Sequence, residues 1–380
     1  MIFLIAKCCR NFRDSTIEQQ NIRFFLSVQN PVLFLHLHMR YSILLITLII
    51  IHSCQQPVDR PDFTEVRVEV LYEDSLSIRA IELMGGSLGF AANKGIFGTI
   101  DLQTKTVRTN SQKYDSIFPE FRAIAHTSTD FFMLSVANPA LLYKTGDKGS
   151  MELVYTEDGE NVFYDAMDFW NDKEGIAIGD NVGGCLSIII TRDGGYSWAK
   201  LPCAQLPKGL EEEGAFAASN TNIVLQGNKG WIGTTKGRVF YTDNKGLSWS
   251  VVQTPILRNK PTQGIYSMDF YDSSLGIAIG GDYTDPDKSI ANKAISRDGG
   301  KSWELLASNQ EPGYKSCIRF VPNSEGKEIV AIGFTGISYT NDMGMNWRTL
   351  SNEGFYTIRF QNDTVAYAAG RNRIAKLTFK

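Results

Sequence analysis

The sequence predicts an all-β fold, namely a seven-bladed β-propeller in which an N-terminal strand completes the last blade. Three observations support this prediction. A turn-forming motif recurs along the C-terminal half, at spacings that match one four-stranded propeller blade. Apolar and polar residues alternate between turns rich in Gly and Asp, and no stretch after Cys54 shows a sustained helical period. The chain of 380 residues, 43% of them hydrophobic, can bury a large core.

The recurring motif has the pattern Ser/Thr-x-Asp-x-Gly-x-Ser/Thr-Trp. The four copies are TRDGGYSW at 191–198, TDNKGLSW at 242–249, SRDGGKSW at 296–303 and TNDMGMNW at 340–347. Their tryptophans are 51, 54 and 44 residues apart, which suits four short strands per repeat. A fifth copy, TGDKGSME from Thr145, keeps Asp147 and Gly149 but lacks the tryptophan.

The residues of this motif are expected to stabilise a turn rather than to catalyse a reaction. The Asp side chain accepts backbone N–H groups between two outer strands, Gly permits a positive φ, and the Trp covers apolar surface. Burial of one large aromatic side chain contributes roughly 3 kcal/mol. The residues assigned to this structural role are Asp193, Trp198, Asn244, Trp249, Asp298, Trp303, Asp342 and Trp347.

A second repeated element precedes the motif and consists of a strand, a turn and a small apolar strand. Examples are MDFWNDKEGIAIGDN from Met167 and MDFYDSSLGIAIGGD from Met268. Together the two elements define seven units within a propeller domain at 63–380. The last unit, 356–379, has room for about three strands. The alternating segment FTEVRVEVLY at 63–72 is expected to supply the fourth strand and so remove an exposed sheet edge.

The residues before this domain are expected to be a targeting segment. An apolar run at 43–51 follows Met39 and Arg40 and leads to Cys54, which is the layout of a signal peptide. The run is too short to cross a bilayer, which takes about 20 helical residues. We interpret 1–38 as an upstream mis-start or leader, 39–53 as a lipoprotein signal peptide and 54–62 as a linker.

The sequence IHSC resembles a lipobox, so Cys54 is predicted to carry a lipid that anchors the protein to the cell envelope. The alternative is an ordinary secretory signal in which Cys54 is incidental. Gln55 lacks the acidic character that retains some lipoproteins at the inner membrane, which favours the outer membrane.

Charge and composition exclude several classes of function. The formal net charge is −3 and no basic run occurs, so nucleic-acid binding is not expected. Once the leader is removed, His126 is the only histidine, which excludes a multi-histidine metal site, and no cofactor is predicted. Cys185 and Cys203 lie symmetrically about a predicted hairpin turn, so they form either a disulfide or two buried thiols.

With the segments EEEGAFAASNTNI from Glu211 and AIGGDYTDP from Ala278, the motif copies resemble the Asp-box propellers of Bacteroidetes lipoproteins. That family is related to the photosystem II stability and assembly factor and, more remotely, to sialidases. The resemblance covers about 63–380 and implies an Asp-box propeller. It does not fix a function, because one fold hosts many functions.

The predicted innermost strands carry the candidate ligand-binding residues. Arginine occupies what we align as one position in four of the seven units, and Asp165 and Tyr266 fill two others. Such strands line the central channel of a propeller, so the guanidinium groups are expected to converge there. Like charges about 8 Å apart repel by around 2 kcal/mol at an effective dielectric near 20, which an anion or acidic side chain must offset. The four arginines are Arg79, Arg122, Arg319 and Arg359.

Glu213 matches the family motif best among the acidic loop residues and is expected to contact these arginines. For Glu213 the alternative is a solvated acidic loop. The resemblance to assembly factors implies an arginine patch that docks an acidic protein or an anionic ligand. The alternative is internal pairing of the arginines with Asp165, Asp168 and Asp269.

Three functions are compatible with these features. The first is a monomeric, non-enzymatic lipoprotein that binds or assembles a protein partner through the arginines. The second is a sialidase-type glycoside hydrolase, because FRAI at 121–124 resembles the Phe-Arg-Ile-Pro motif of sialidases. Its nucleophile, partner carboxylate and acid/base would be Tyr266, Glu213 and Asp165. The third is a purely structural envelope lipoprotein.

Overall fold

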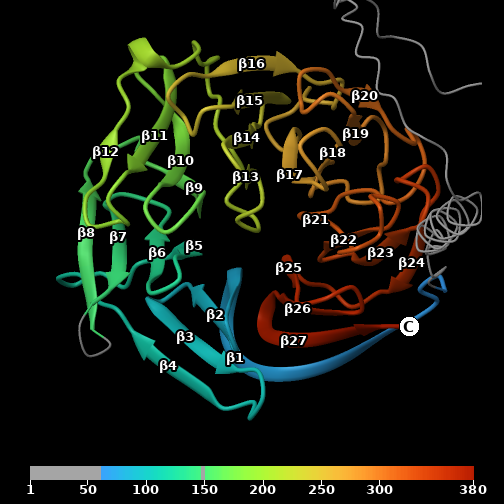
Figure 1. Cartoon of the computed structure of the whole chain (residues 1–380), viewed down its shortest axis with the longest axis horizontal. Coiled ribbons are helices and arrows are strands. Elements are labelled where there is room, and N and C mark those ends of the chain that lie inside the picture. Colours follow the sequence, from blue (N-terminus) through green and yellow to red (C-terminus); the bar gives the residue numbers. More distant parts are fainter. Residues whose placement is uncertain (1–60, 147–149) are drawn as a thin grey trace, which may run out of the picture. The chain divides into compact units, whose positions relative to one another are not determined.

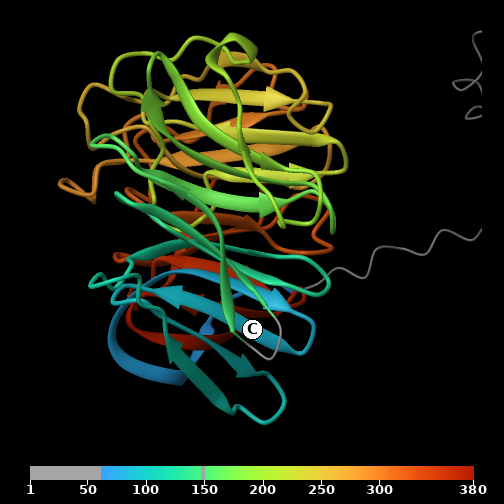
Figure 2. The same ribbon diagram turned by 90° about the vertical axis from the view of Figure 1, so that its left-hand side faces the viewer.

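The computed structural model describes residues 61–146 and 150–380, and these residues form repeated antiparallel sheets around a common centre (Figure 1). Five sheets have four strands each and one has seven. The helical structure in the described part of the chain is a single 3₁₀ turn, η2 (Cys203–Gln205). Seen from the side, neighbouring sheets stack in layers (Figure 2). The fold is therefore an all-β propeller.

The sheets follow one another along the chain. The seven-stranded sheet contains β1 (Val66–Met84), β2 (Ser87–Ala92), β3 (Ile96–Asp101), β4 (Val107–Ser111), β25 (Thr357–Phe360), β26 (Val365–Ala369) and β27 (Arg371–Phe379). The next two are β5 (Phe121–His126), β6 (Phe131–Ser135), β7 (Ala140–Thr145) and β8 (Met151–Glu157), then β9 (Tyr164–Phe169), β10 (Gly175–Val182), β11 (Cys185–Thr191) and β12 (Ala199–Lys200). The last three are β13 (Ile223–Gln226), β14 (Lys229–Gly233), β15 (Arg238–Thr242) and β16 (Ser250–Gln253), then β17 (Ile265–Phe270), β18 (Gly276–Gly280), β19 (Lys293–Ser296) and β20 (Glu304–Leu305), and finally β21 (Cys317–Phe320), β22 (Ile329–Gly333), β23 (Gly336–Thr340) and β24 (Arg348–Ser351).

Strand β1 is long because it belongs to two groups of four strands. Its first part pairs with β27, from Val66 opposite Phe379 to Ser77 opposite Arg371. Its second part, from Ile78 to Met84, pairs with β2. The segment 63–72 thus lies beside the last strand of the chain, where the alternating sequence placed it. The innermost strands β1, β5, β9, β13, β17, β21 and β25 each contact the next, and β25 contacts β1.

The repeated pairing of Phe with a later Gly has a packing reason. A Cβ at Gly276 would lie 2.4 Å from the ring of Phe270, and one at Gly175 would lie 2.7 Å from the ring of Phe169. Glycine therefore leaves room for an aromatic side chain from the neighbouring innermost strand. This explains the recurring pattern of an aromatic residue, a turn and a small apolar strand.

The turn motifs show how the acidic or amide side chain fixes each turn. Asp298 Oδ1 accepts the backbone N–H of Ser302 at 2.9 Å, and Oδ2 accepts its hydroxyl at 2.6 Å. Asn244 Oδ1 accepts the N–H of Ser248 at 2.9 Å in the same way. Equivalent bonds are made by Asp193 and Asp342. The fifth copy falls partly outside the described residues, at 147–149.

The structure joins Cys185 and Cys203 by a disulfide with a Cα–Cα distance of 5.4 Å. Cys185 begins β11, but Cys203 lies in η2, beyond the end of the short strand β12. The bridge therefore fastens a connecting turn to the sheet, rather than linking two strands across a hairpin. The leader, the signal peptide and Cys54 lie outside the described residues. Within the described part, no helix has the length and apolar character needed to cross a membrane.

Candidate functional site

A loop at residues 216–222 crosses the centre of the propeller, just before β13 (Figure 1). We call it the central segment. Its last four residues are buried, and Asn220 adopts a positive φ of 57°, which Asn tolerates better than most residues. Hydrogen bonds tie the segment to strands β1, β5, β9, β17 and β25 and to Ser316, directly before β21: Arg79 to Ala218 (3.4 Å), Asn220 to Ile124 (2.8 Å), Met167 to Asn220 (2.9 Å), Thr221 to Ser267 (2.7 Å), Thr357 to Ser219 (2.9 Å) and Ser219 to Ser316 (2.7 Å).

Two pockets adjoin the central segment, and none of the described residues lines both of them. The first pocket has a volume of about 690 Å³, and the first three residues of the central segment form part of its lining. We call it the aromatic pocket. The second, of about 180 Å³, is lined by Asn220 and by β13, and we call it the polar pocket. Because residues 219–222 are buried between them, the segment divides the centre of the propeller.

The four predicted arginines therefore do not converge on one site, and that expectation is wrong. Arg79 and Arg122 line the aromatic pocket, whereas Arg319 and Arg359 line the polar pocket. The reason is a β-bulge. The ladders of β1, β5, β9 and β17 each shift register at one residue, and these residues are Arg79, Arg122, Asp165 and Tyr266.

A bulge inserts one residue and re-aims its side chain. Arg319 and Arg359 instead occupy regular ladder positions, opposite Val330 and Tyr367. They share their pocket with Glu82 and Asp269, which lie three residues after the bulges at Arg79 and Tyr266. Arginines in the similar sequences IRA and IRF thus occupy two different positions in their strands.

The aromatic pocket combines cationic and aromatic side chains, and no Asp or Glu is among its described lining residues. The Phe216 and Tyr266 rings stack at 3.7 Å, and Tyr314 meets Tyr266 edge-on at 4.8 Å. The Arg79 guanidinium lies over the Tyr356 ring, 4.2 Å from its centroid. The remaining side chains of interest are Arg122, Arg371, Tyr283 and Phe334.

The electrostatics of this pocket favour an anionic group. Burial and the neighbouring Arg122 lower the pKa of the Arg79 guanidinium. Arg79 Nε is buried without a hydrogen-bond partner among the described residues. Arg122 is held by Glu120, with its Nε 2.8 Å from the carboxylate, and Glu120 is itself largely exposed. A buried donor without an acceptor costs free energy that a bound carboxylate would recover.

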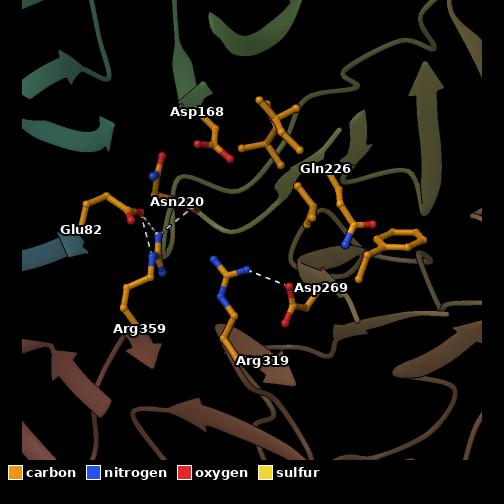
Figure 3. A pocket seen from close by; sticks show the side chains of 11 residues that line it. Glu82, Asp168, Asn220, Gln226, Asp269, Arg319 and Arg359 are labelled. Carbon is orange, nitrogen blue, oxygen red and sulfur yellow. Dashed lines mark hydrogen bonds and ion pairs between the residues drawn. The ribbon is translucent and has the colours of Figure 1, made fainter. Parts of the chain in front are cut away.

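The polar pocket, in contrast, contains its own counter-charges (Figure 3). Arg359 Nε donates to Glu82 at 2.7 Å, and Arg319 Nη1 donates to Asp269 at 3.1 Å. Burial and the charge of Glu82 raise the pKa of Asp168 to about 7. Internal pairing of the arginines, the alternative considered above, thus holds for Arg319, while Arg359 pairs with Glu82.

Glu213 lies apart from the arginines of both pockets, and the expectation that it contacts them is wrong. Its side chain is buried, and Oε1 accepts hydrogen bonds at 2.8 Å from Thr234 and from Arg238 Nε. Oε2 accepts the backbone N–H of Leu210 at 2.9 Å. These contacts fix the loop that leads into the central segment, so Glu213 positions the site rather than lining it.

Asp165 and Tyr266 occupy bulges but are both buried. Neither Asp165 oxygen accepts a hydrogen bond of ordinary geometry from the described residues. Burial and the adjacent Asp180 raise the pKa of Asp165 well above its usual value, and burial raises that of Asp180 to about 6. The Tyr266 hydroxyl donates to the Thr262 carbonyl at 2.8 Å. Since Arg238 and Thr234 hold Glu213, the structure does not assemble the sialidase-type set.

Apart from Tyr266, the aromatic residues of the pocket were missed by sequence reasoning, and so was Arg371. Tyr314, Phe334 and Tyr356 lie in loops outside the aligned strands, so no periodicity marked them. The central segment did leave a signal. FAASNTN at 216–222 breaks the alternation expected of a strand and is made mostly of small and polar residues.

The fold and the site define a β-propeller with a divided centre and a cationic, aromatic pocket on one side. No protein family and no curated protein matches this chain. Solved structures do resemble it. YCF48 bound to D1 peptide has a TM-score of 0.58 at 12% identity, covering 84% of this chain and 98% of that one. RRP9 WD40 repeats have a TM-score of 0.59 at 12% identity, covering 83% and 98%. YCF48 from Cyanidioschyzon merolae has a TM-score of 0.56 at 11% identity, covering 83% and 98%. These likenesses establish the fold.

Proposed function

We propose that this protein is a non-enzymatic binding or assembly factor that holds an acidic or carboxylate-bearing protein segment in the aromatic pocket. The observation that carries the proposal is Arg79: within the described part of the chain its buried Nε has no acceptor, and no carboxylate lines its pocket. Arg122 and Arg371 add positive charge to the same pocket. An ionised carboxylate would complete these donors through charge-assisted hydrogen bonds.

A peptide is the class of ligand that best suits the rest of the pocket. Tyr283 and Phe334 are exposed at its rim, while Tyr266 and Tyr314 are buried at its base, so apolar or aromatic side chains can pack beside the carboxylate. The similar protein YCF48 is bound to a D1 peptide in its solved structure, which supports a peptide here.

The proposal includes the architecture and the location. We count the seven-stranded sheet as two blades that share β1, which makes a closed ring of seven blades built on Asp-box turns. We further propose that the chain is exported by the signal peptide at 39–53 and anchored through a lipid on Cys54, with the propeller monomeric at the outer membrane. The apolar run before Cys54 supports export, and mass spectrometry of the N-terminal peptide from envelope fractions tests lipidation.

The binding role is tested by comparing variants of one pocket with a matched control. Wild-type protein is used to capture envelope proteins, and the captured segment is then synthesised with its carboxylates free or converted to amides. Fluorescence anisotropy should show weaker binding, by tenfold or more, for Arg79→Gln and for Arg122→Gln. Arg108→Gln, an exposed change on β4, should bind as the wild type does.

The amide form of the peptide should bind wild-type protein as weakly as the free form binds the Arg79→Gln variant. Circular dichroism must first show that each variant is folded. Equal affinity of all three folded variants for the free peptide would overturn the proposal and leave the arginines with a structural role.

A further inference from the structure

The polar pocket is a second space with chemistry of its own, on the other side of the central segment. Its volume of about 180 Å³ exceeds the roughly 15 Å³ that one water needs by about tenfold. Glu82, Asp168, Asp269 and Arg319 are only partly buried, so the space is reachable from outside. In Figure 3 the Asp168 carboxylate and the two guanidinium groups point into the same space.

The charges in this pocket do not balance. Arg359 is paired with Glu82 and Arg319 with Asp269, so each base has one acid. Asp168 has no basic partner among the described residues. One of its oxygens accepts the N–H of Phe169 at 2.8 Å, and the other is open to the cavity. An ionised Asp168 therefore leaves the pocket with an excess negative charge.

The Arg319 guanidinium faces the same space as the Asp168 carboxylate (Figure 3). Its Nη1 donates to Asp269 at 3.1 Å. A small molecule in the pocket can therefore donate to Asp168 and accept from the guanidinium of Arg319.

We propose that the polar pocket binds a small ligand with an ammonium group, of the size and zwitterionic character of an amino acid. Its ammonium group donates to Asp168, and its carboxylate accepts from the Arg319 guanidinium. The cation balances the charge of Asp168, while the two existing ion pairs hold the walls in place. This site is independent of the peptide-binding role of the aromatic pocket, because the two pockets have no lining residue in common in the part of the chain that the structure describes.

The affinity of this site should depend on pH. Asp168 faces Glu82, Asp269, Arg319 and Arg359, and burial with the charge of Glu82 raises its pKa to about 7. Only the ionised carboxylate attracts the ammonium group. The affinity is therefore fully developed above this pKa and falls by about tenfold per pH unit below it.

Isothermal titration of the intact protein at pH 8 tests the site with three probes: glycine, methylammonium and acetate. Glycine and methylammonium should bind at millimolar concentration, glycine more tightly, and acetate should not. Asp168→Asn should weaken glycine binding by tenfold or more, since it removes the charge and keeps the shape. The control Asp158→Asn, on an exposed residue outside the pocket, should bind as the wild type does.

The isosteric Asp168→Asn variant should fold, and circular dichroism of the variant beside the wild type must show this first. The proposal is overturned if neither ammonium probe binds, if acetate binds instead, or if Asp168→Asn binds glycine as the wild type does. Failure here leaves peptide binding untouched, and a loss of peptide binding in the Arg79→Gln variant leaves glycine binding untouched.

Discussion

The two pockets beside the central segment are built from the same innermost strands, yet they differ in how their buried charged side chains are paired. In the polar pocket each arginine has a carboxylate of its own. In the aromatic pocket Arg79 lies over a tyrosine ring and its Nε has no acceptor among the described residues. The two pockets draw on strand positions three residues apart, one in a bulge and one in the regular ladder. A single strand can thus present an unpaired cation to one pocket and a paired acid to the other.

This difference separates stability from binding. A buried ion pair is costly to break, because the remaining partner is left uncompensated. A cation without a carboxylate is already uncompensated, so its removal costs the fold little and its charge is available to a ligand. The comparison predicts that equivalent arginine substitutions will have different consequences on the two sides.

The largest effect is expected from Arg319→Ala, which leaves the Asp269 side chain, only 15% exposed, without its partner. We expect a loss of about 3 kcal/mol in the free energy of unfolding. Arg79→Ala should cost less than about 1 kcal/mol, because it removes no ion pair. Urea denaturation of both variants measures the difference. Equal losses in the free energy of unfolding would show that the two arginines have the same role, and would contradict the expected difference between the two pockets.

The division between the pockets depends on Asn220. Asn220→Ala removes the acceptor of the Met167 N–H and the donor to the Ile124 carbonyl, both buried. We expect a loss of about 2 kcal/mol in the free energy of unfolding and faster hydrogen exchange at 216–222. Exchange measured by mass spectrometry separates this local loosening from a general loss of stability. An unchanged exchange rate there would mean that the other hydrogen bonds suffice to hold the segment.

Asp165 and Asp180 extend the comparison to acids without a base. Their raised pKa values mean that the folded state holds a proton that the unfolded chain releases above about pH 4. Stability should therefore fall as pH rises from about 4 through about 6. Asp165→Asn removes this penalty and should be more stable than the wild type at pH 8 by on the order of 2 kcal/mol.

The same variant should match the wild type below about pH 4, where both Asp165 and Asp180 are protonated. Urea denaturation over a pH series measures this, with Asp158→Asn as an exposed control. A constant offset between Asp165→Asn and wild type across the series would point to packing instead of titration.

The sequence predicted the all-β fold well because its repeats report local geometry. Turn residues such as Asp298 recur with a partner Trp, and strand alternation places 63–72 beside the last strand without any knowledge of long-range contacts. The same reasoning failed for the arginines. A bulge adds one residue to a strand, and no feature of the amino-acid sequence marks it. Arg79 and Arg319 therefore looked equivalent.

The candidate site was predicted in part for a related reason. Arg79 and Arg122 were identified because they lie on strands with a repeating pattern. Tyr314 and Tyr356 lie in loops, and only the folded arrangement of the sheets brings them to the same pocket. The pairing of Glu213 with Arg238 likewise depends on how the loop folds, because Arg238 lies 25 residues further along the chain.

The smallest expected effect concerns the turn motifs, where one copy carries Asn in place of Asp. Asp298→Ala should cost about 1 kcal/mol, because it leaves the backbone N–H of Ser302 without its acceptor. Asp298→Asn should cost about 0.5 kcal/mol or less, as Asn244 makes the equivalent bond in its own turn. Burial opposes ionisation of Asp298, but hydrogen bonds from Ser302 and Ser296 lower its pKa, so its contribution is present at neutral pH and is lost as pH falls below about 4. The gap between Asp298→Asn and wild type should therefore close in acid. A gap that persists there would show that the Asp298 carboxylate acts through its shape and not through its charge.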